Sequence, residues 1–118
     1  MRLAAVALCL ALNACGDRQR VPPALSGDVE NGRLLLRQFG CGSCHAIPGV
    51  AVANGRVGPP LDGVANRVYL AGVLPNTPEN MATFIRAPKA VDPLTAMPDL
   101  GVTETHARHM VAYLYTLR

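Results

Sequence analysis

Residues 41–45 read Cys41-Gly42-Ser43-Cys44-His45, and this Cys-x-x-Cys-His stretch is the signature of covalent attachment to a c-type haem. Two thiols at this spacing can be presented by one short turn to one edge of the ring, where they add to its vinyl groups. The histidine that follows is then held beneath the iron as the proximal ligand. The small residues between the cysteines let the backbone lie close to the porphyrin.

A Cys-x-x-Cys pair is also half of a zinc site or a dithiol redox motif, so both alternatives must be weighed. A zinc site needs two further Cys or His ligands at a matching spacing, and no second pair follows here. A thioredoxin-like motif needs a strand–helix–strand context, which this sequence does not indicate. A disulfide framework is not predicted, because Cys41 and Cys44 are assigned to haem and Cys9 lies in a predicted leader.

The composition fits one small domain with a cofactor at its centre. A chain of 118 residues is enough for one domain, and a haem supplies apolar surface that so small a core lacks. The formal net charge is +3 and the only lysine is Lys89. Because Lys and Arg form no patch, nucleic acid is not a predicted partner.

The N-terminal region resembles a bacterial export signal. Residues 3–12 are an unbroken apolar run, which suits a signal peptide and is too short to span a bilayer. The sequence Leu12-Asn13-Ala14-Cys15 resembles a lipobox, so residues 1–14 are predicted to be a lipoprotein signal peptide and Cys15 to be lipidated. Residues 15–26 then form a flexible linker. The alternative is an ordinary signal peptide, which leaves Cys15 as a free thiol.

Apolar periodicity predicts three helices in the rest of the chain. The first begins at residues 28–30 and ends near Gly40; the second covers residues 78–86, capped by Thr77; the third begins after Thr103 and continues to the C-terminus. Gly-rich and Pro-rich loops separate them, and no convincing strand is found. We therefore predict an all-α domain over residues 27–118, with long loops around a cofactor.

With its pieces in this order, the region 27–118 resembles a class I cytochrome c in its small bacterial form. The motifs that carry the resemblance are the first helix with Gly32, Cys41–His45, Gly58-Pro59-x-Leu61, Met97-Pro98 and Ala112-Tyr113-Leu114. The resemblance implies three main helices with short helical turns and long loops, wrapped around one covalent haem c. It also implies that Gly32 and Tyr113 mark the crossing of the first and last helices.

The resemblance further implies roles for residues around the haem. His45 is the proximal ligand, and its far ring nitrogen donates a hydrogen bond to the Pro59 carbonyl, which fixes the ring orientation. Leu61 packs on the haem face. Arg67 stands near the propionates, although a solvated surface arginine is an alternative interpretation of the same residue.

The sixth iron ligand is predicted to be Met97, which lies in a loop between two helices. Such a loop can wrap to the far side of the ring and offer the thioether sulfur there, with Phe84 packed beside it. Met81 and Met110 lie at helical spacing among apolar residues, where methionine is more often a packing residue.

His106 and His109 are the rival ligands, and both are predicted to be surface residues of the last helix. A methionine–histidine pair raises the reduction potential of haem relative to two histidines. With both axial positions filled, the chemistry is reversible one-electron transfer. The exposed edge through which the electron passes is predicted to be framed by Ala46, Ile47 and Pro98.

The sequence therefore predicts an electron carrier, not an enzyme, on the periplasmic side of a bacterial membrane. Its partners would be redox proteins, with a dehydrogenase as donor and an oxidase or another cytochrome as acceptor, and the membrane through the lipid anchor. If Cys15 carries no lipid, the protein would be soluble in the periplasm. A peroxidase or gas sensor with a labile methionine ligand is one alternative, and an accessory subunit of a dehydrogenase or terminal oxidase is another.

Overall fold

The computed structural model of the chain describes residues 23–118. The predicted signal peptide, Cys15 and residues 15–22 of the predicted linker lie outside the described residues. Within the described part, no helix combines the length and the apolar character that a membrane span needs.

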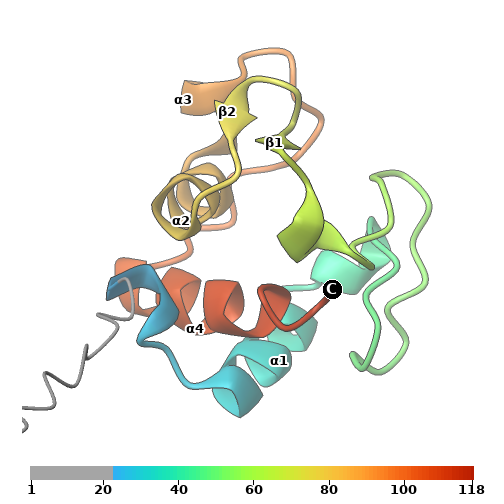
Figure 1. The fold of residues 1–118 in the computed structure, drawn as a ribbon. Helices are drawn as coiled ribbons and strands as arrows, with labels where there is room; N and C mark the ends of the chain where they lie inside the picture. Colours follow the sequence, from blue (N-terminus) through green and yellow to red (C-terminus); the bar gives the residue numbers. More distant parts are fainter. Residues whose placement is uncertain (1–22) are drawn as a thin grey trace, which may run out of the picture.

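The described chain is mostly helical, with one small antiparallel hairpin (Figure 1). The helices are α1 (Val29–Gln38), α2 (Pro78–Arg86), α3 (Pro88–Val91) and α4 (Glu104–Leu114). Three short 3-10 turns cover Pro23–Leu25, Cys41–Ser43 and Val64–Asn66. The hairpin joins β1 (Tyr69–Leu70) to β2 (Leu74–Pro75), with Leu70 opposite Leu74.

The three longer helices begin at side-chain caps. Asp28, Thr77 and Thr103 each accept a hydrogen bond from the backbone N–H three residues later, at 2.6, 3.1 and 3.2 Å. Each bond satisfies one of the N–H groups that a helix leaves unpaired at its start. The predicted bounds of α2 and the predicted start of α4 are therefore confirmed.

The structure differs from the predicted helices in two respects. The short helix α3 was not predicted; after Ala87, Pro88 occupies its first turn, where the missing N–H of proline leaves no hydrogen bond of the helix unmade. The last helix ends at Leu114 and not at the C-terminus, and Leu117 donates a backbone hydrogen bond to Leu114 in a closing turn.

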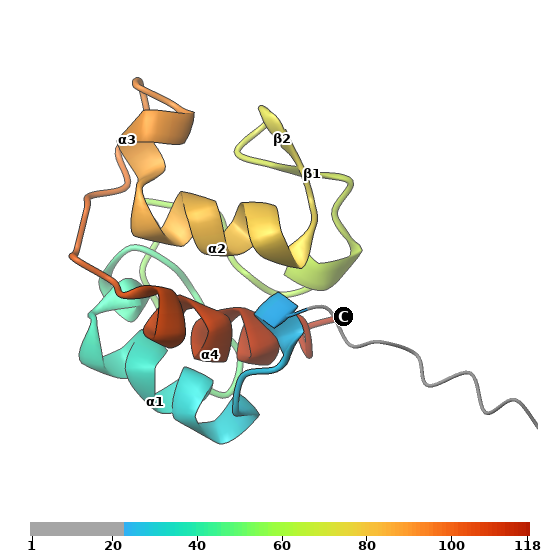
Figure 2. The same cartoon turned by 90° about the vertical axis from the view of Figure 1, so that its left-hand side faces the viewer.

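α1 and α4 cross closely, and both views show them side by side (Figures 1 and 2). The contact is made at Gly32, where an added Cβ would lie 2.6 Å from the carbonyl carbon of His109 and 3.1 Å from the Cβ of Tyr113. Only glycine lets the two backbones approach this far. The expectation that Gly32 and Tyr113 mark the crossing is confirmed.

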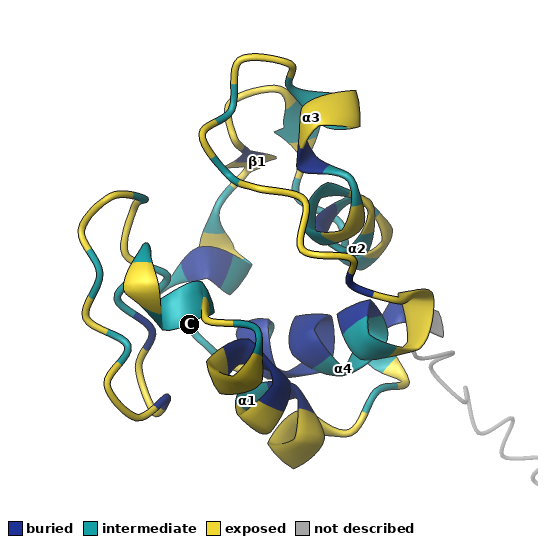
Figure 3. Cartoon of the chain, turned by 180° about the vertical axis from the view of Figure 1, so that it is seen from behind, coloured by how far each residue is buried: buried dark blue, intermediate teal, exposed yellow. Residues whose placement is uncertain are grey.

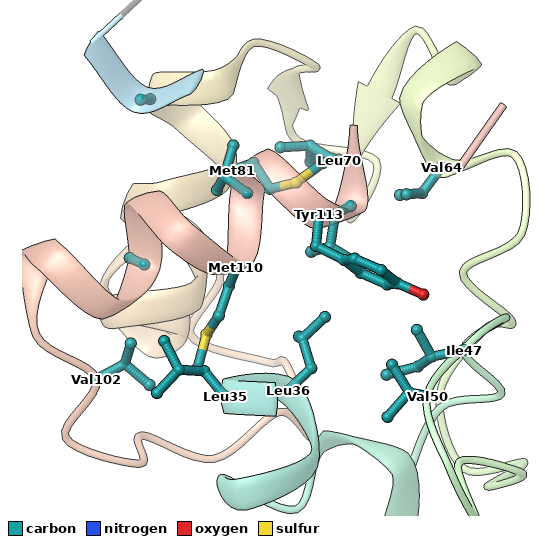
Figure 4. Packing of buried hydrophobic residues seen from close by; sticks show 14 residues of the cluster. Leu35, Leu36, Ile47, Val50, Val64, Leu70, Met81, Val102, Met110 and Tyr113 are labelled. Atoms are coloured by element: carbon teal, nitrogen blue, oxygen red, sulfur yellow. The ribbon is translucent and has the colours of Figure 1, made fainter. Parts of the chain in front are cut away.

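The core lies along the inner side of α4, as the burial colours of Figure 3 show. Met110 and Val111 are fully buried there, and Leu35 and Leu36 of α1 pack into the same cluster (Figure 4). Ile47 is also in this cluster and only 3% exposed, so the prediction that it frames an exposed edge is wrong.

The hairpin was not predicted. Its strands are two residues long, too short to show an alternating pattern, and its turn depends on Ala71 and Gly72, which have φ of 50° and 73°. Glycine adopts this left-handed region readily and alanine does not. The all-α prediction is thus correct for the main elements and wrong for residues 69–75.

Candidate functional site

The Cys41–His45 segment is a tight turn that directly follows α1. Gly40 has φ of 72°, a left-handed conformation that ends the helix and redirects the chain. The backbone N–H groups of Cys44 and His45 both donate to the Cys41 carbonyl, at 3.2 and 3.0 Å. Both cysteines and the imidazole are therefore held within one compact turn, as the spacing predicts.

Gly42 has a different role from the predicted one. A Cβ at this position would lie 2.6 Å from the Cα of Ala53, so Gly42 allows the turn to pack against the following loop. Gly42 does not line the main cavity, whereas Ser43 does. The close approach is thus to the protein's own backbone.

A cavity of about 470 Å³ opens between the turn, α2 and α4, within the size range of small-molecule and cofactor sites. Most of its wall is apolar. All eight residues predicted to bind a cofactor line it: Cys41, Cys44, His45, Pro59, Leu61, Arg67, Phe84 and Met97. They come from segments more than fifty residues apart in the sequence.

His45 is held in one orientation by the loop beyond it. Its Nδ1 atom lies 2.7 Å from the Pro59 carbonyl oxygen, and because that oxygen can only accept, Nδ1 carries the proton. An added Cβ at Gly58 would lie 2.7 Å from Nδ1 and 2.9 Å from Nε2, so glycine makes room for the ring. In a neutral ring, Nε2 then keeps its lone pair free for a metal ion.

Arg67 stabilises the same loop from the other side. Its guanidinium donates to the carbonyls of Pro60 and Asp62, the latter at 3.4 Å. Arg67 is therefore bound to the turn that follows Pro59, and it is not the freely solvated arginine of the alternative interpretation. Its position on the cavity wall is compatible with the predicted role near propionates.

Met97 is carried by a loop with local hydrogen bonds. Its backbone N–H donates to the Thr95 hydroxyl at 3.2 Å, and the Thr95 N–H donates to the Asp92 carbonyl at 3.1 Å. The ammonium of Lys89 in α3 donates to the Thr95 carbonyl at 3.3 Å. These bonds shape the loop just before the methionine.

Two further methionines line the same cavity. Met81 and Met110 are 3% and 0% exposed, which confirms their prediction as core residues. The sequence did not predict that these two methionines line the cavity. Their places on the inner faces of α2 and α4 would indicate it, once these two helices are known to form the cavity wall.

Asn76 is a structural residue of the site that sequence reasoning missed. Its amide nitrogen donates to the carbonyls of Val64 and Arg67, both at 2.8 Å, and its amide oxygen accepts from the Tyr115 hydroxyl at 2.9 Å. Val64 and Arg67 both line the cavity, so Asn76 fixes a part of its wall. An asparagine in a loop has no pattern that could reveal this network.

The two rival histidines do not line the cavity, and both are half-buried at the surface rather than freely solvated. The Nδ1 of His109 accepts a 2.8 Å hydrogen bond from the backbone N–H of Asp28. The His106 ring packs edge-on against Phe39, with ring centres 5.6 Å apart, and its Nδ1 is buried. Both histidines therefore belong to the contact between α1 and α4.

The two thiols of the turn are free, and burial raises the pKa of Cys41. Across residues 23–118, no group of three or more His, Cys, Asp and Glu side chains is placed to hold a metal ion. The zinc alternative therefore finds no support in the described residues. An apolar cavity lined by two thiols, an oriented imidazole and a thioether fits a covalently bound haem.

Comparison with known proteins points in the same direction, although no family model matches the chain. Cytochrome c oxidase subunit 2 of Alkalihalophilus pseudofirmus is 31% identical over 93 residues, which cover 76% of this chain and 26% of that protein. Cytochrome c-type cyt cy of Rhodobacter capsulatus is 31% identical over 109 residues, 81% of this chain and 52% of that protein. This chain thus spans only about a quarter and about half of these relatives. Both likenesses support a place in the cytochrome c family, haem c as the cofactor and a role in electron transfer.

Proposed function

We propose that this protein is a one-electron carrier whose haem c is bound through Cys41 and Cys44, with His45 and Met97 as axial ligands. The observation that supports this most strongly is the His45 imidazole, oriented by the Pro59 carbonyl in the wall of an apolar cavity that both thiols and Met97 also line. When bound, the haem supplies a reversible Fe(II)/Fe(III) couple.

The chain's own residues set the conditions for that couple. Pro59 fixes the proton on Nδ1 of His45 and leaves Nε2 for the iron. Leu61 and Phe84 belong to the apolar wall that excludes water. Arg67, held by the carbonyls of its own loop, supplies positive charge for the propionates.

The proposed setting is the periplasmic side of a bacterial membrane. Residues 1–14 would be removed as a signal peptide, lipidated Cys15 would anchor the protein, and residues 15–26 would link the anchor to the domain. The proposed donor is a dehydrogenase and the proposed acceptor an oxidase or another cytochrome. The likeness to an oxidase subunit supports an oxidase as the acceptor. Membrane fractionation of the Cys15→Ser variant, which should release the protein, tests the anchor.

The absorption spectrum and the reduction potential test the ligands. The oxidised protein should show the weak red band of sulfur-to-iron charge transfer, and Met97→Ala should remove that band and lower the potential. Met81→Leu is the matched control: it replaces another methionine of the cavity and should keep the band. An unchanged band in Met97→Ala would contradict the assignment. Carbon monoxide binding by the reduced wild-type protein would support a sensor or peroxidase instead.

A further inference from the structure

The loop that carries Met97 has few hydrogen bonds to the rest of the domain. It leaves α3, runs along one side of the molecule and returns to α4 (Figure 2). The backbone N–H of Met97 donates to a side chain of the loop itself. Within the described residues, the bond from Lys89 to the Thr95 carbonyl is the only hydrogen bond between a helix and residues 93–102. The ammonium of Lys89 is therefore well placed to restrain this loop.

Lys89 belongs to a helix that is firmly packed into the domain. The preceding residue, Pro88, is fully buried, and its carbonyl accepts a hydrogen bond from the Asp92 N–H at 2.9 Å, which closes the short helix α3. From this base, the Nζ atom of Lys89 donates to the Thr95 carbonyl oxygen at 3.3 Å. The Thr95 hydroxyl in turn accepts a hydrogen bond from the Met97 N–H at 3.2 Å. The ammonium is thus joined through one residue to the backbone of the methionine.

We propose that Lys89 is a positioning residue, which keeps the Met97 sulfur at the iron by holding Thr95. The inference rests on the proposed function, in which Met97 is an axial ligand. A charged donor makes a stronger hydrogen bond to a carbonyl than a neutral donor does. Because Lys89 is exposed, water competes for its ammonium, so the bond slows the opening of the loop without preventing it. Loss of the ammonium should therefore let Met97 leave the iron more often.

The first test measures how fast imidazole replaces Met97 in the oxidised, haem-loaded protein, followed by the loss of the sulfur-to-iron band. At high imidazole concentration, the rate no longer depends on that concentration and reports the opening of the loop. Lys89→Gln should raise this limiting rate about threefold. Lys89→Arg keeps a charged donor and should restore most of the wild-type rate. Arg86→Gln is the matched control, since it removes the same charge from an exposed position at the end of α2, and it should keep the wild-type rate.

The second test measures hydrogen exchange of single backbone amides by NMR in the reduced, haem-loaded protein, where no added ligand is needed. The Met97 amide, which donates to the Thr95 hydroxyl, should exchange about threefold faster in Lys89→Gln than in the wild type. The Asn80 amide, which donates to the Thr77 hydroxyl at the start of α2, should keep its wild-type rate. This pair of amides distinguishes local opening of the loop from a general loss of stability.

The outcomes separate the inference from the function on which it rests. If the wild type shows the sulfur-to-iron band and Lys89→Gln has wild-type rates in both tests, only the role of Lys89 is overturned. Equal acceleration by Lys89→Gln and Arg86→Gln would do the same, because it would show that total charge and not the bond to Thr95 decides the rate. A haem-loaded wild-type protein without that band would overturn both.

Discussion

The substitution Gly32→Ala tests the close crossing of α1 and α4. The new Cβ would lie 2.6 Å from the His109 carbonyl carbon, whereas carbon atoms in contact prefer about 3.5–4.0 Å. The obstacle is the backbone of a packed helix, so the helices must separate by about 1 Å. Overpacking of this kind costs about 1–3 kcal/mol, and the upper end applies here.

Alanine also stabilises a helix by about 1 kcal/mol relative to glycine, which leaves a net loss of about 2 kcal/mol. For a domain of this size, that loss lowers the Tm by roughly 8–16 °C. Thermal unfolding of the haem-loaded protein, followed by far-UV circular dichroism, measures the shift. Asn31→Ala, on the exposed side of the same helix, is the control and should change the Tm by only a few degrees. A Gly32→Ala protein as stable as the wild type would refute the argument.

Three further predictions concern polar side chains of the domain. Tyr113→Phe removes the 2.6 Å bond from the Tyr113 hydroxyl to the Pro48 carbonyl and should cost about 1 kcal/mol in urea unfolding; no change would mean that the bond contributes nothing. Asn76→Ala leaves the Val64 and Arg67 carbonyls and the Tyr115 hydroxyl without this partner. It should therefore lower the free energy of unfolding by about 2–3 kcal/mol and shift the reduction potential. The control Asn54→Ala, at an exposed position, should change neither quantity. Burial, and then the charge of Glu79, raise the pKa of Tyr115. The folded state therefore binds this proton more tightly, and stability should fall as the pH rises above about 10, less steeply in Tyr115→Phe; identical alkaline profiles of the two proteins would contradict this.

The features that the sequence predicts well are those encoded by neighbouring residues. Thr77 and Thr103 reveal helix starts, because a cap acts on the backbone three residues away. The Cys41–His45 spacing reveals the compact turn for the same reason. The crossing at Gly32 is also predictable, since glycine within a helix is unfavourable unless something approaches it closely.

The features that the sequence does not reveal depend on partners far away in the chain. His109 accepts a hydrogen bond from the backbone N–H of Asp28, 81 residues away, and the apolar periodicity of α4 does not indicate that partner. The role of Asn76 cannot be predicted either, because its three hydrogen bonds join it to backbone and side-chain groups of two other segments. The hairpin escapes prediction because two-residue strands carry almost no pattern.

The central claim is a haem joined by two thioether bonds to Cys41 and Cys44, and the mass of one peptide tests it directly. Trypsin should cut after Arg37 and Arg56, which releases residues 38–56 with both cysteines and His45. In protein produced by a host that matures c-type cytochromes, this peptide should be heavier than its sequence by one haem. A peptide of unmodified mass, with both thiols open to alkylation, would contradict the account.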